Sequence, residues 1–135
     1  MSQLDTYKKA AIATNWTRAE MLVFVYDRLL ASLEACEIGR DAGDEKIVAL
    51  NQLEVFKAIA ALESGLRPDE DEVAANIARL LHFVVGEVEN HNFNSSIRAI
   101  QPVRDAFAAI QEQANQLEAK GEIQPVPDDV LKSMA

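Results

Sequence analysis

The sequence has little of what most catalytic and metal-binding proteins need. It contains one cysteine and two histidines in 135 residues, so it cannot form an internal disulfide or a site with several thiolate ligands. Its five glycines are scattered, and neither a phosphate-binding glycine loop nor a Gly-x-Ser-x-Gly motif is present. His82 and His91 lack the Glu-x-x-His spacing of di-metal helical bundles. We therefore expect no metal, no cofactor and no enzymatic activity.

Long apolar runs and clusters of positive charge are missing as well. The longest hydrophobic runs are about six residues, far below the ~20 that a membrane span needs. The N-terminus lacks the basic-then-apolar order of a secretion signal. The net charge is −9, and no group of Lys and Arg could bind a phosphate backbone. These absences predict a cytoplasmic protein that neither inserts into membranes nor binds nucleic acid.

What is present fits a single globular domain. Hydrophobic residues make up 49% of the chain and charged residues 26%, which is the composition of a folded protein rather than a disordered one. The negative charge is uneven, because residues 41–72 hold nine acids against three bases. We interpret this segment as a solvated connection that aids solubility. Cys36 lies on an apolar stripe, so we expect it to be a small buried hydrophobic residue.

Four segments have the spacing of amphipathic helices. The first starts at Thr17, whose side chain forms a capping box with Glu20, and ends near Gly39. The second covers residues 44–64, the third follows the acids at 69–72 and ends near residue 90, and the fourth starts at Ser95 or Ser96 and ends near residue 120. His82 is expected inside the bundle and His91 in a turn, and a kink is expected at Pro102. No useful strand pattern occurs.

This pattern predicts an all-α fold, an antiparallel four-helix bundle with a short N-terminal segment packed across it. We expect residues 1–16 to form an N-terminal flap, residues 17–120 the bundle and residues 121–135 a flexible tail. The chain also has more apolar surface than the core stripes require. Met21, Phe24 and Tyr26 lie partly off the first stripe, and Leu53 and Phe56 are offset in the second. Burial between neighbouring helices and a groove for a partner segment both explain this surplus.

Short motifs also follow one another in a definite order. They are Tyr7, Ile12 and Thr14; Glu20 followed by Leu22 and Tyr26-Asp27; Asn51 with Lys57-Ala58 and Ala61-Leu62; Ala75-Asn76-Ile77 with Leu80-Leu81-His82-Phe83-Val84; and Ile100-Gln101-Pro102-Val103. This order resembles the flagellin export chaperones of the FliS family over about residues 4–118. The chain departs from the family pattern at Ala10, where the family has Asn, and at Pro102, where it has an acidic residue.

The resemblance implies a function. Chaperones of this family bind the disordered C-terminal segment of flagellin in the cytoplasm, prevent premature polymerisation and deliver flagellin to the flagellar type III export apparatus. By this resemblance Tyr7, Ile12 and Tyr26 are expected to bind the partner, and Leu53 and Phe56 are added because of their offset from the core stripe. Components of the export apparatus and a second copy of the chain are further expected partners. The alternatives are an oligomerising helical bundle, an adaptor with another client, and a bundle that binds a small ligand or metal.

Overall fold

The computed structural model describes residues 18–69 and 71–119, which form four α-helices and no strand. The helices are α2 (Arg18–Asp41), α3 (Glu45–Ser64), α4 (Glu72–Glu89) and α5 (Phe93–Ala119). None of these helices is long and apolar enough to cross a membrane. The expected flap and tail lie outside the described residues. The prediction of an all-α four-helix bundle is confirmed.

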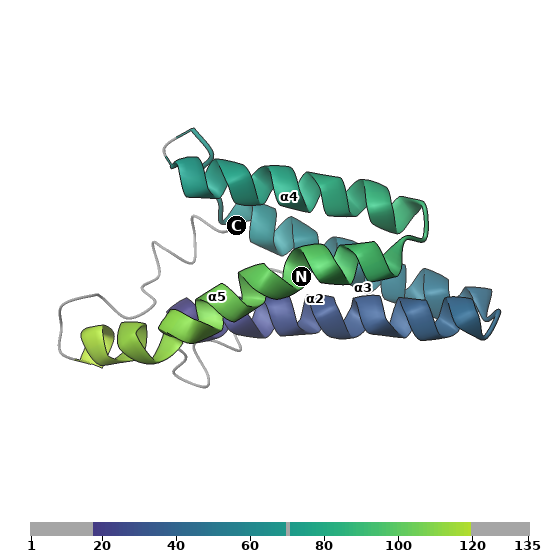
Figure 1. Ribbon diagram of the computed structural model, residues 1–135, viewed down its shortest axis with the longest axis horizontal. Coiled ribbons are helices and arrows are strands. Elements are labelled where there is room, and N and C mark those ends of the chain that lie inside the picture. The colour runs from purple at the N-terminus through teal and green to yellow at the C-terminus, as the bar shows by residue number, and fades with distance from the viewer. Residues whose placement is uncertain (1–17, 70, 120–135) are drawn as a thin grey trace.

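Successive helices run in opposite directions, and Figure 1 shows them as an up-down-up-down arrangement. α2 packs most extensively against α3 and α5. α4 closes the bundle by lying against α5 and α3, over smaller contacts. This arrangement follows from the short connections, because helices joined by a few residues pack as antiparallel neighbours. The result is a tight core around α2 and a more loosely attached α4.

The starts of α3 and α4 are fixed by aspartates. Asp44 accepts a hydrogen bond from the Ile47 backbone N–H at 3.1 Å, and Asp71 accepts one from Val73 at 2.8 Å. Each carboxylate pairs a backbone N–H that has no partner within the helix. The turn before Asp44 contains Gly43 with φ of +70°, a conformation that glycine adopts without strain.

The start of α5 differs from the prediction. The helix begins at Phe93, not at Ser95 or Ser96, because the backbone reverses over only a few residues after α4. His91 adopts a left-handed φ of 60°, which turns the chain sharply. The backbone of Ser96 then donates to the Asn92 carbonyl at 3.1 Å, so the helical bonds already start from Asn92. The prediction of His91 in a turn is confirmed.

Contacts across the bundle hold this turn against the end of α2. Arg40 donates to the His91 carbonyl at 2.9 Å, and its guanidinium lies over the Phe93 ring at 5.8 Å from the centroid. The His91 ring stacks on Phe93 at 5.3 Å. Phe93 itself is fully buried. The α2–α3 and α4–α5 turns are therefore joined at the same end of the molecule.

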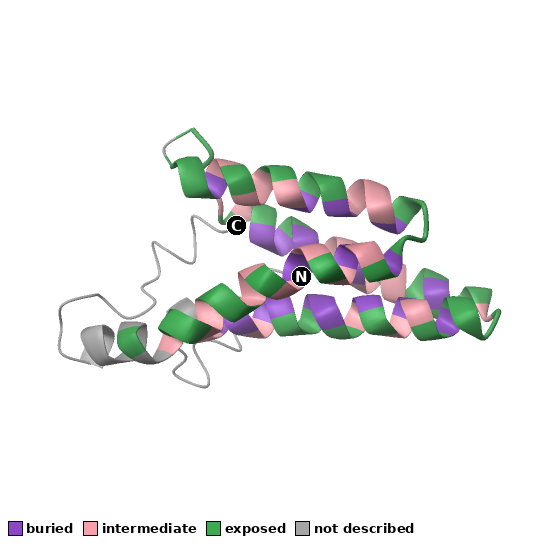
Figure 2. Ribbon diagram, viewed as in Figure 1, coloured by how far each residue is buried: buried purple, intermediate pink, exposed green. Residues whose placement is uncertain are grey.

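The core lies between α2, α3, the buried face of α4 and the first part of α5, as Figure 2 shows. Cys36 is buried in it, and its thiol contacts the Val48 carbonyl at 3.8 Å. Burial raises the pKa of this thiol to about 11, so it stays protonated at neutral pH. The expectation of a buried Cys36 is confirmed. His82 is exposed, contrary to our prediction, because it follows the buried Leu81 and one residue turns a helix by about 100°.

Candidate functional site

An apolar groove of about 440 Å³ runs between α4 and α5. Its lining is almost wholly hydrophobic and consists of Val73, Ile77, Pro102, Val103, Ala106, Phe107 and Ile110. Val73 is 63% exposed and Ile110 is 51% exposed, although both are large apolar side chains. Water therefore contacts a concave hydrophobic surface here, which is the usual form of a site that binds an apolar ligand or segment.

The groove exists because α4 and α5 separate. They are joined at the turn after Glu89, and Figure 1 shows their axes moving apart toward the opposite end of the bundle. α5 has 27 residues and α4 only 18, so α4 cannot cover the whole apolar stripe of α5. After Ile100, no residue of α5 whose exposure the structure describes is buried. The hydrophobic pattern of α5 thus continues beyond the point at which the core ends (Figure 2).

Pro102 lies at this transition. The helix continues through it, although proline has no N–H to donate to the carbonyl four residues earlier. Figure 1 shows the axis of α5 changing direction part-way along its length, which fits the kink expected for an interior proline. The proline ring is exposed and forms part of the groove lining. The same residue therefore bends the helix and adds apolar surface to the site.

An aromatic pair fixes the part of α5 that carries the groove. The ring of Phe107 stacks on Tyr26 of α2, with centroids 5.6 Å apart and planes inclined by 19°. Tyr26 is 2% exposed, and this burial raises its pKa to about 12. Since Phe107 also lines the groove, Tyr26 supports the groove wall from behind rather than facing it.

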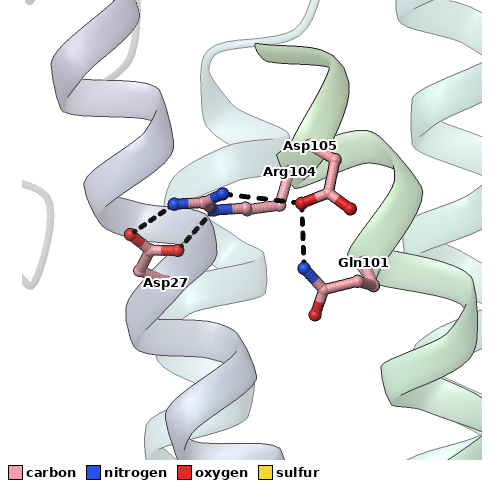
Figure 3. A network of polar contacts seen from close by, with 4 residues as sticks. All are labelled: Asp27, Gln101, Arg104 and Asp105. Atoms are coloured by element: carbon pink, nitrogen blue, oxygen red, sulfur yellow. Dashed lines mark hydrogen bonds and ion pairs between the residues drawn. The ribbon is translucent and has the colours of Figure 1, made fainter. Parts of the chain in front are cut away.

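An ion pair makes a second connection between α2 and α5 near this stack. Arg104 donates from Nε to one oxygen of Asp27 at 2.7 Å and from an NH₂ group to the other at 3.5 Å, as Figure 3 shows. Asp105 accepts from Gln101 at 3.0 Å and from Arg104 at 3.5 Å. The hydrogen bond and charge of Asp27 raise the pKa of Arg104. These exposed contacts orient α5 on α2. They leave the opposite side of α5, which faces α4, free to line the groove.

The groove has the chemistry of binding and not of catalysis. Its lining contains no acid, base or nucleophile, so nothing in it could transfer a proton or form a covalent intermediate. An apolar side chain placed in it would gain about 1–3 kcal/mol from burial. A segment with several such side chains at helical spacing would contact both α4 and α5.

Of the five predicted partner-binding residues, the structure describes Tyr26, Leu53 and Phe56, and none of these three lines the α4–α5 groove. Tyr7 and Ile12 lie outside the described residues. Tyr26 is buried behind the groove and Met21 is 1% exposed, so burial between neighbouring helices, one of the two explanations for their offset, applies to both. Leu53 is 51% exposed on α3, and Phe56 is half-buried against the core. Neither lines the α4–α5 groove.

Sequence reasoning missed the groove itself. Val73, Ile77 and Ile110 have the same helical spacing as buried residues, so the sequence pattern alone predicts that they belong to the core. Periodicity shows which residues share a helix face, but not whether another helix covers that face. One signal was available. The fourth predicted segment is longer than the third, so the third segment cannot cover the whole apolar stripe of the fourth.

Comparison with known proteins agrees with the architecture. The chain matches the family described as Flagellar protein FliS over residues 1–120. Searches of curated proteins and of solved structures give no match. The match covers nearly the whole chain and includes all four described helices, because it ends one residue after α5. The chain therefore belongs to the FliS family, a family of flagellar export chaperones and not of enzymes.

Proposed function

We propose that this chain is a cytoplasmic export chaperone that binds the disordered C-terminal segment of flagellin in the α4–α5 groove. The observation that carries the proposal is the hydrophobic, half-exposed lining of this groove in a member of the FliS family. A disordered segment must be ordered on binding, which costs conformational entropy. Burial of apolar side chains from both partners supplies the compensating free energy.

Covering the segment also accounts for protection against premature polymerisation. An apolar segment that would otherwise associate with further flagellin chains is held against Val73, Phe107 and Ile110. Because no covalent step is involved, the complex can dissociate when the export apparatus receives flagellin. The groove lining supports the proposal that the segment is held and covered. The family membership supports the proposal that flagellin is then passed to the export apparatus.

The N-terminal segment has a place in this proposal. Tyr7 and Ile12 match the family motif, and residues 1–16 directly precede α2 in the sequence, the helix whose Tyr26 supports the groove wall. We expect residues 1–16 to compete with flagellin for apolar surface at rest. Deleting these residues should then strengthen binding of the flagellin segment, whereas weaker binding would mean that Tyr7 and Ile12 contact flagellin directly.

Binding of full-length flagellin and of flagellin without its C-terminal segment tests the proposal. We expect only the full-length protein to be retained by the immobilised chain. Size measurement of the chain alone and with flagellin separates this function from that of an oligomerising bundle. Equal retention of both flagellins would exclude the proposed binding mode.

A further inference from the structure

A second apolar surface lies on α3, away from the core. Leu50 is 57% exposed and Leu53 is 51% exposed, while the buried face of the helix is formed by other residues, among them Val48, Val55 and Ile59. Neither leucine belongs to the α4–α5 groove. Two exposed leucines three residues apart lie next to each other on a helix, so they form one patch.

The pattern around these leucines is that of a helix-pairing seam. Lys46, Leu50, Leu53, Lys57 and Ala60 follow one another at steps of four, three, four and three, which is the heptad spacing of residues that meet a partner helix. Lys46, Ala60 and both leucines are exposed, and Lys57 is half-exposed. We call these five residues the α3 seam. It has an apolar centre, a lysine on each side and a small residue at one end.

The charges decide which partner fits. If two copies of the chain met through this seam in parallel register, each lysine would face its equivalent. In an antiparallel pairing centred on the leucines, Lys46 would face Lys57 of the other copy. Both arrangements place like charges together at the interface, which is unfavourable. A second copy is therefore a poor occupant, and a helix with carboxylates at the matching positions is a good one.

We propose that the α3 seam docks an amphipathic helix of another protein, in which two acidic residues bracket a short apolar stripe. Lys46 and Lys57 are eleven positions apart, which corresponds to about 16 Å along a helix. The partner needs carboxylates at that separation, with leucine-like side chains between them. Lys57 already contacts Glu54 at 3.4 Å, but an exposed pair of this kind is weak and can exchange for the partner's carboxylate.

The test uses a fluorescent synthetic helix of about 18 residues, long enough to cover the seam. It carries two leucines at heptad spacing between two glutamates eleven residues apart, and a matched peptide has lysines in place of the glutamates. Binding of both peptides to the full chain is measured by anisotropy. The variants are Leu50→Gln with Leu53→Gln, Lys46→Glu with Lys57→Glu, and, as a control, Val73→Asp with Ile110→Asp in the groove.

We expect the acidic peptide to bind the full chain at least about tenfold more tightly than the basic one. The leucine variant should weaken it by about tenfold or more, the charge-reversed variant should prefer the basic peptide, and the groove variant should bind like the unaltered chain. No preference between the peptides would overturn the proposal. It would also be overturned if the flagellin C-terminal segment displaced the acidic peptide, or if the leucine substitutions converted a dimer of the chain to a monomer.

Discussion

The ionisation of Tyr26 tests the aromatic support of the groove. Burial raises the pKa of its phenol to about 12, against about 10 in an unfolded chain. The neutral phenol is thus favoured by the folded protein, and the resulting stability is fully present below pH 10. As the pH rises from 10 to 12, the unfolded chain releases this proton first, and the stability is lost. The full loss is about 2.7 kcal/mol, of which about 1.4 kcal/mol is reached at pH 11.

The comparison is between the unaltered chain and Tyr26→Phe, which keeps the stacked ring and removes the titrating group. We expect their free energies of unfolding in urea to move apart by about 1.4 kcal/mol in favour of the variant between pH 8 and pH 11. Cys36, whose pKa is also raised by burial, titrates in both proteins and cancels. Phenolate absorbance should show one of the two tyrosines ionising near pH 12. An unchanged difference, or two tyrosines that both ionise near pH 10, would refute the burial of Tyr26 behind the groove.

Further substitutions probe the packing around the site. Phe93→Ala should destabilise the chain by about 3–5 kcal/mol in urea unfolding, because this ring is fully buried where two turns meet; a loss below about 1 kcal/mol would contradict that packing. Gly39→Ala should destabilise it, since the added Cβ would lie 2.8 Å from Ile47, whereas Gly86→Ala meets no atom within 4 Å and should stabilise α4 by up to about 1 kcal/mol. Melting temperatures in the opposite order would show that one of these contacts is misplaced. Arg104→Ala should lower the melting temperature in low salt and have little effect in high salt, and a salt-independent loss would mean that Arg104 acts through packing instead.

Local signals in the sequence predicted most of the helices and their boundaries. Asp44 and Asp71 precede apolar stripes, and both cap helices, because capping depends on residues that are adjacent in the chain. The start of α5 was not predictable in this way. It depends on the left-handed backbone of His91 and on the contact of Arg40 with the His91 carbonyl, which joins residues 51 positions apart.

The site was harder to predict than the fold, for a related reason. Tyr26 and Leu53 are both offset from the stripes of their helices, yet Tyr26 is buried and Leu53 is half-exposed. The difference arises because α5 covers this part of α2 through Phe107, while no described helix covers the outer face of α3. Ile110 has the spacing of a core residue and remains exposed because α4 and α5 separate. Such properties depend on the angle between helices, which the pattern within one helix does not specify.

The most direct test of flagellin binding is a titration of the isolated C-terminal segment of flagellin into three forms of the chain. These are the unaltered protein, the groove variant Val73→Asp with Ile110→Asp, and the control Ile38→Asp, whose side chain is 69% exposed and outside the groove. Because the substituted side chains are exposed, all three proteins should fold. We predict that the groove variant binds at least about tenfold more weakly than the other two, since it loses apolar contacts and places carboxylates against the segment. Equal affinities for the three proteins would contradict binding of flagellin in the α4–α5 groove.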